Sequence, residues 1–348
     1  MNFKKCFLAL VAGSVLLVSC NNDDDNGSVG QTGAFANGTF VLNEGNSTPS
    51  TASVTFIGDD GTVQYDVYTT VNPGKPGLGT YLQEIFFDDD KAFIISGSAN
   101  KVTVVNRYTF EYIATVDTNF ENPRYGAVVN GKAYITNYAD YATGDDDFLT
   151  VVNLADYTTS KVALKNWSEK ILAENGKLYI ANGYYGDGTS VTVFNPANNS
   201  IEAVIELGAS PESFQEEDGI LYVLGGGKLS RINLATNKVS GTVTLPEALT
   251  YSAQDLTIED DQIYFTASTS VYKMSVNSTT IPAAPLLTYT STSKYGAMYG
   301  FNVNDDKIYI ADGGDFSSDS NVYTYSLNGN LLNTYKVGVG PNGFYFND

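Results

Sequence analysis

The sequence of 348 residues contains no histidine, two cysteines and one tryptophan. Without histidine, the chain lacks the most common general base and the most common transition-metal ligand. The cysteines are Cys6 and Cys20, so every later residue belongs to a segment with no thiol nucleophile and no possible disulfide. Stability therefore has to come from packing and chain topology.

Basic residues are also scarce. Lysine and arginine together number 19 against 39 acidic residues, which gives a formal net charge of -20. Such a surface repels nucleic acids and anionic lipid headgroups, so we expect no nucleic-acid partner. The charge also keeps an exposed protein in solution.

The first residues have the pattern of a secretory signal peptide, assigned to 1–19. Lys4 and Lys5 precede an apolar run, residues 7–18, that is too short to remain as a membrane-spanning helix. The run ends in Leu-Val-Ser-Cys, which resembles the bacterial lipobox, whose cysteine is acylated and becomes the first mature residue. We expect Cys20 to carry the lipid, and the membrane to be contacted through this anchor only.

Residues 20–36 comprise the acylated cysteine and a polar, acidic, glycine-containing stretch that we interpret as a flexible tether. The acids that follow Cys20, at 23–25, resemble the signal that sends some lipoproteins to the outer face of the outer membrane. We therefore expect an outer-membrane lipoprotein exposed at the cell surface. An anchor that faces the periplasm is the alternative.

The rest of the chain repeats one short phrase, a tight turn followed by an apolar strand. A diverged copy occupies residues 38–45, and a second apolar phrase follows every copy. This spacing suits the blades of a β-propeller, which take roughly 40 to 50 residues for four strands. Six clear copies are centred on aromatic residues 41 to 45 positions apart: Phe93, Tyr134, Tyr179, Tyr222, Tyr264 and Tyr309.

A shorter strand precedes each clear copy but is missing before the first, diverged one. Residues 340–348 supply a matching strand at the far end of the chain. We therefore predict that residues 37–348 form one all-β domain, a seven-bladed β-propeller with four antiparallel strands per blade. The C-terminal strand completes the N-terminal blade and closes the ring, which removes exposed sheet edges.

Loops of variable length are expected on one face of this ring, and binding is usually placed on such loops. They are rich in tyrosine, whose ring and polar tip suit flat or amphipathic ligands. The candidate ligand-binding residues are Glu44, Tyr81, Arg124, Tyr125, Tyr138, Tyr141, Trp167, Lys170, Tyr184, Tyr185, Tyr251 and Tyr295.

Catalysis has few candidates, and we predict no catalytic residue and no cofactor. Some propeller hydrolases hold a divalent cation in the central channel, and Glu44 with Asn46 is the candidate pair. We expect no matching acids at the channel positions of the other blades. The loop acids offer oxygen ligands for Ca²⁺ without the spacing of an EF-hand, and we interpret them as solvated. They are Asp145, Asp146, Asp147, Asp312, Asp315 and Asp319.

The anchor and the repeat together resemble the YncE-like propeller lipoproteins that carry the domain of unknown function DUF5074. The likeness depends on the opening phrase FVLNEGN at 40–46, on strands of the NGKLYIAN type, and on the lipobox before an acidic tether. It implies a surface protein that captures a small nutrient for a TonB-dependent outer-membrane transporter, with a cobalamin-like macrocycle as the leading ligand. The resemblance identifies no ligand-binding residue in this chain. Two alternatives stay open: a metal-dependent hydrolase such as a lactonase, and an adhesion scaffold that binds a protein.

Overall fold

The computed structural model describes residues 33–47, 50–184 and 187–347, and for Tyr184 only the backbone. The chain divides into residues 1–31 and a compact unit of residues 32–348, and every described strand and helix belongs to the second unit. The expected signal peptide and lipid anchor at Cys20 lie outside the described residues. No helix in the part of the chain that the structure describes has the length and apolarity needed to cross a membrane.

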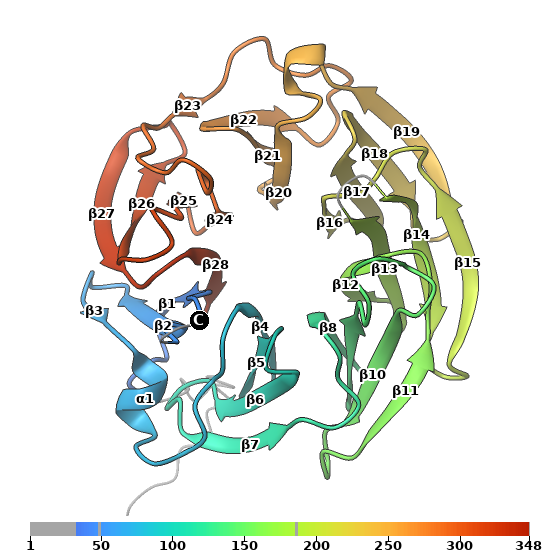
Figure 1. Ribbon diagram of the computed structural model, residues 1–348. Coiled ribbons are helices and arrows are strands. Elements are labelled where there is room, and N and C mark those ends of the chain that lie inside the picture. The colour runs from blue at the N-terminus through green and yellow to red at the C-terminus, as the bar shows by residue number, and fades with distance from the viewer. Residues whose placement is uncertain (1–32, 48–49, 185–186, 348) are drawn as a thin grey trace, which may run out of the picture. The chain divides into compact units, whose positions relative to one another are not determined.

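Seven four-stranded antiparallel sheets are arranged in a ring, which confirms the predicted propeller (Figure 1). The innermost strands are β4 (Leu82–Asp88), β8 (Pro123–Val129), β12 (Ser168–Glu174), β16 (Ser213–Glu217), β20 (Ala253–Glu259), β24 (Gly300–Asn304) and β28 (Pro341–Phe346). The second strands are β1 (Gly38–Asn43), β5 (Lys91–Ser96), β9 (Lys132–Asn137), β13 (Lys177–Tyr184), β17 (Ile220–Gly225), β21 (Gln262–Ala267) and β25 (Lys307–Ala311).

The third strands are β2 (Ser53–Gly58), β6 (Lys101–Asn106), β10 (Phe148–Asn153), β14 (Asp187–Asn195), β18 (Lys228–Asn233), β22 (Ser270–Ser275) and β26 (Ser320–Ser326). The outermost strands are β3 (Val63–Gln64), β7 (Tyr112–Val116), β11 (Thr159–Ala163), β15 (Ser200–Glu206), β19 (Lys238–Thr244), β23 (Leu287–Thr288) and β27 (Leu331–Val337). Two short helical turns, α1 (Val67–Val71) and η1 (Glu247–Leu249), lie between blades.

The repeated apolar phrases form the second and third strands, and neighbouring blades bury both of their faces. In β5 every residue after the first is buried, whereas β27 is exposed along most of its length. The core consists of clusters between blades, such as the one in which Tyr134 of one blade packs with Leu178 and Phe194 of the next. Burying apolar area between all the sheets, without any disulfide, stabilises the ring.

The C-terminal strand closes the ring as predicted, because β28 pairs antiparallel with β1 and places Phe344 opposite Val41. The segment before β1 adds a second link. Phe35, which falls in the range expected to be tether, is buried and packs edge-on against Phe56 with ring centroids 5.2 Å apart. The side-chain amide of Asn347 donates a hydrogen bond from Nδ2 to the backbone carbonyl of Phe35. The two ends of the described chain are therefore joined by side chains as well as by strand pairing.

Candidate functional site: the central channel and its mouth

A central channel of about 580 Å³ is lined by residues from the innermost strands of all seven blades. Five of these strands shift register near their first residues, as in β8 between Pro123 and Gly126. Such a bulge bends the strand and re-aims side chains. At each of these five shifts, two neighbouring residues of the strand line the channel or its mouth. They are Gln83 and Glu84, Arg124 and Tyr125, Glu169 and Lys170, Gln254 and Asp255, and Asn342 and Gly343.

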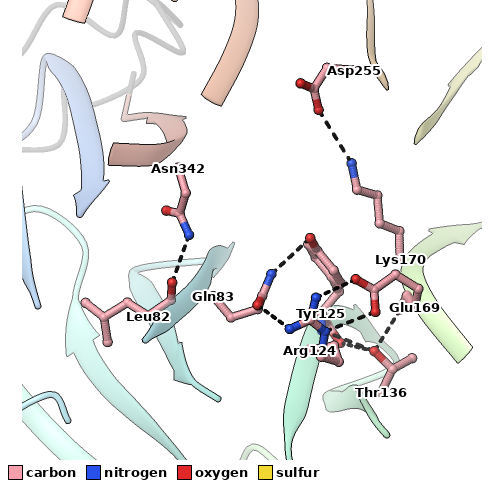
Figure 2. Close-up of polar contacts among 9 residues, drawn as sticks. All are labelled: Leu82, Gln83, Arg124, Tyr125, Thr136, Glu169, Lys170, Asp255 and Asn342. Atoms are coloured by element: carbon pink, nitrogen blue, oxygen red, sulfur yellow. Dashed lines mark hydrogen bonds and ion pairs between the residues drawn. The ribbon is translucent and has the colours of Figure 1, made fainter. Parts of the chain in front are cut away.

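Arg124 is the centre of a hydrogen-bonded network that joins three blades (Figure 2). Its Nε and Nη2 donate to the two carboxylate oxygens of Glu169 at 3.0 and 2.7 Å. Its Nη1 donates to Oε1 of Gln83 at 2.6 Å, and Nε2 of Gln83 donates to the hydroxyl of Tyr125 at 3.0 Å. The guanidinium carbon also lies 4.9 Å from the ring centroid of Tyr138. This network fixes the side chains at the boundary between channel and mouth.

The positive charge of Arg124 is neutralised inside the protein by the carboxylate of Glu169. Burial acts to lower its pKa, but the facing carboxylate of Glu169 outweighs burial and holds the pKa well above its ordinary value. Burial also raises the pKa of Tyr125 far above its ordinary range. The bidentate pair is therefore a rigid, neutralised unit, and its planar geometry suits a fixed wall of the site.

Three further ionisable groups, Lys170, Asp255 and Glu84, face the channel. Figure 2 shows the ammonium group of Lys170, on β12, facing the carboxylate of Asp255, on β20. Nζ of Lys170 lies 4.0 Å from Oδ1 of Asp255. Oε2 of Glu84 accepts a hydrogen bond from the backbone nitrogen of Gly126 at 2.6 Å. Burial raises the pKa of Glu84 to about 8, so this carboxyl is mainly protonated at pH 7. The channel thus offers a neutral carboxyl and an ammonium group rather than a uniform negative field.

The mouth of the channel is a wider hollow of about 730 Å³. Tyr251 and Tyr295 line it and are 94% and 89% exposed. Arg124, Tyr125 and Lys170 line both the channel and the mouth. The mouth therefore combines two exposed aromatic rings with a rigid polar base.

The structure brings together seven of the candidate residues. Tyr138 is fully buried rather than exposed in a loop, but it still lines the mouth. Glu44 lines the channel, and its carboxylate accepts a hydrogen bond from the hydroxyl of Tyr299. The seven are Glu44, Arg124, Tyr125, Tyr138, Lys170, Tyr251 and Tyr295.

The other candidates lie elsewhere. Tyr81 and Tyr141 are exposed and line neither the channel nor the mouth, and Trp167 lines a separate hollow. Tyr184 ends β13, but its side chain is not among the described parts, and Tyr185 lies outside the described residues. The predicted binding face is therefore divided between at least two hollows.

The expectation that no acids recur at channel positions was wrong. Glu84 and Asp255 line the channel, and Glu169 and Glu212 line the mouth. Sequence reasoning missed them because it searched the variable loops, although adjacent polar residues at the start of successive innermost strands were visible as a pattern. These acids do not converge on one point. Among the described residues, the three carboxylates close enough to share an ion are Glu217, Asp218 and Asp261, which do not line the channel.

The expectation that the loop acids are all solvated was wrong for two of them. Asp147 and Asp312 are each 1% exposed. Oδ2 of Asp147 accepts from the backbone nitrogen of Ser168 at 2.6 Å, and Oδ2 of Asp312 accepts from the hydroxyl of Ser291 at 2.6 Å. These carboxylates hold loop backbones in place, as buried polar groups with internal partners do.

Comparisons with known proteins agree with the architecture. The family model of a domain of unknown function, DUF5074, matches residues 37–347. A search of curated proteins found no match. A solved quinoprotein alcohol dehydrogenase-like protein from Bacteroides thetaiotaomicron is 17% identical, with a TM-score of 0.65 over 90% of this chain and 79% of its own.

Two further solved structures are similar in fold. A streptogramin B lyase is 14% identical, with a TM-score of 0.56 over 80% of this chain and 86% of its own. BamB from Moraxella catarrhalis is 13% identical, with a TM-score of 0.53 over 90% of this chain and 92% of its own. At these identities the likeness concerns the fold alone, since one fold supports many unrelated functions.

Proposed function

Because the chain belongs to the DUF5074 family, whose description assigns no activity, we propose its function from the site itself: it is a binding protein that captures a small nutrient at the mouth of the propeller channel. A cobalamin-like macrocycle is the leading ligand, and a TonB-dependent outer-membrane transporter is the proposed recipient. A lipid on Cys20 anchors the protein to the outer membrane, with the propeller at the cell surface.

One observation carries this proposal, the placement of Tyr251 and Tyr295 at the mouth. The two residues are 94% and 89% exposed, and exposed large aromatic side chains that gather at one hollow mark a binding surface. The rigid pair of Arg124 and Glu169 lines the same hollow. Aromatic anchors together with fixed polar groups are a common way to bind an amphipathic ligand of low flexibility.

Binding is favoured over hydrolysis because the channel carboxyls are engaged separately. Glu169 is paired with Arg124, Glu84 accepts from Gly126, and Asp255 faces Lys170. A metal-dependent hydrolase needs ligand atoms that converge on one ion. The adhesion scaffold remains the other alternative, and it would use the same mouth.

Isothermal titration of the wild-type protein with cobalamin tests the ligand directly. We expect saturable heat at micromolar concentration, and a loss of affinity of about tenfold or more when Tyr251 and Tyr295 are both changed to alanine, because each stacked ring contributes about 1 kcal/mol. Tyr65→Ala is the matched control, since Tyr65 is 53% exposed but lines neither hollow. Absence of heat with the wild type would remove cobalamin as the ligand.

The anchor has a test of its own. Cys20→Ser removes the acylation site, so we expect the protein to move from the membrane fraction to the soluble fraction. Protease treatment of intact cells then distinguishes a surface-exposed propeller from one that faces the periplasm. An unchanged membrane fraction for Cys20→Ser would contradict lipid anchoring at this residue.

A further inference from the structure

The single tryptophan of the chain lines a hollow that shares no residue with the channel or its mouth. This hollow measures about 420 Å³. Around Trp167 it presents hydrogen-bonding side chains from four segments: Asp145, Asn166, Thr189 and Glu206. The hydroxyl of Thr189 lies 3.4 Å from Oε2 of Glu206.

The backbone at Trp167 has an unusual conformation. Asn166 and Trp167 have φ values of 71° and 62°, in the left-handed region. That region costs a residue with a side chain roughly 1 to 2 kcal/mol, and consecutive bulky residues rarely occupy it. Such outliers persist only where the surroundings impose them, and they cluster at functional sites.

Specific contacts impose this conformation. The backbone nitrogen of Asn166 donates to the carbonyl of Gly144 at 2.8 Å, and the backbone nitrogen of Gly183 donates to the carbonyl of Trp167 at 2.9 Å. The next peptide nitrogen, of Ser168, donates to the buried carboxylate of Asp147. The segment is thus clamped on both sides of the tryptophan.

The indole ring is also held in position. A Cβ atom added to Gly144 would lie 2.6 Å from the backbone nitrogen of Trp167 and 3.0 Å from Cδ1 and Cγ of its ring, so only glycine lets this loop pack so closely on Trp167. The side chain is only partly buried, and it borders the hollow. Trp167 is therefore a rigid aromatic surface beside exposed carboxylate, amide and hydroxyl groups.

From this arrangement we propose that the Trp167 hollow is a second binding site, which takes a pyranose sugar ring. The C–H face of a pyranose packs against the indole, and its equatorial hydroxyls donate to Glu206 and Asp145 and pair with Asn166 and Thr189. The acidic side chains disfavour anionic ligands, so the sugar carries no carboxylate, sulfate or phosphate group. This site does not depend on ligand capture at the channel mouth.

The chain also has 25 tyrosines, so the fluorescence is excited at the long-wavelength edge, where tyrosine does not absorb; the emission then comes from Trp167, the only tryptophan. The probes are methyl glucoside, methyl galactoside, N-acetylglucosamine and cellobiose, and the acyclic polyol sorbitol is the control ligand. We expect a saturable change in emission with at least one ring sugar and none with sorbitol. Glu206→Gln, an exposed position, weakens that binding about tenfold, whereas Tyr251→Ala at the mouth leaves it unchanged.

Three results would overturn the proposal. The first is no saturable change with any of the four sugars up to about 10 mM, a range that covers even weak binding. The second is an equal response to sorbitol or an unchanged affinity in Glu206→Gln. The third is a loss of sugar binding in Tyr251→Ala, which would assign the response to the mouth. Circular dichroism of each variant verifies that the propeller is folded.

Discussion

Replacing Glu84 with glutamine isolates the cost of placing a carboxyl group in the channel. Burial raises its pKa from an ordinary 4.5 to about 8, so the folded protein holds a proton that the unfolded chain releases. The stability contributed by this proton is fully present below pH 4.5 and is lost as the pH rises through 8. Glutamine keeps an oxygen that accepts from the backbone nitrogen of Gly126 but cannot ionise.

The magnitude follows from the two pKa values. Each pH unit over which the folded state holds one extra proton lowers the free energy of unfolding by about 1.4 kcal/mol. Between pH 5 and pH 7 the unfolded carboxyl is mostly ionised and the folded one mostly protonated. The wild type should therefore lose about 2.5 kcal/mol more than Glu84→Gln over this interval. Asp147, whose pKa burial raises to about 7, has the same effect in both proteins and cancels from the difference.

Urea unfolding of the two proteins at several pH values and constant ionic strength measures this difference. Urea is suitable because it adds no salt to screen the channel charges. We expect the two stability curves to converge toward pH 5 and to separate toward pH 8, with the variant more stable at the higher pH. Parallel curves from pH 5 to pH 8 would show that Glu84 ionises in the folded protein as it does in water, and the reasoning would fail.

Three further changes test the ring and the network. Deleting residues 340–348 removes β28 and exposes the edge of β1, so calorimetry should give a sharply lower melting temperature; an unchanged melt would contradict closure by this strand. Arg124→Ala leaves the Glu169 carboxylate buried without its partner, so urea titrations should give a free energy of unfolding lower by about 3 kcal/mol. A loss below about 1 kcal/mol would show that water already solvates the Arg124–Glu169 pair. Gly126→Ala puts a methyl group 2.3 Å from the ring of Phe86 and should cost about 1 to 3 kcal/mol, and equal stability would mean that the ring moves aside freely.

Much of the candidate site is predictable by residue type but not by position. The sequence places Tyr251 and Tyr295 in loops, and both line the mouth. It places Trp167 on the same face, although this residue borders a separate hollow, because linear order does not tell which side of a loop faces the channel. The partners of Arg124 were missed, since Gln83 and Glu169 are 41 and 45 residues away along the chain and meet it only through the ring.

The sequence by itself determined the architecture. The period of the repeat sets the length of each four-stranded blade, and the strand at the C-terminal end supplies the innermost strand that the first blade lacks, which closes the ring. Each apolar phrase specifies its own strand through local patterning, and seven copies leave one way to bury them all. Only the tertiary structure decided the chemistry of the channel. The pKa of Glu84, the Arg124–Glu169 pair and the strained backbone at Trp167 arise where segments from different blades come together. Desolvation and hydrogen bonding at those meeting points depend on distances in space, which a repeat along the chain does not specify.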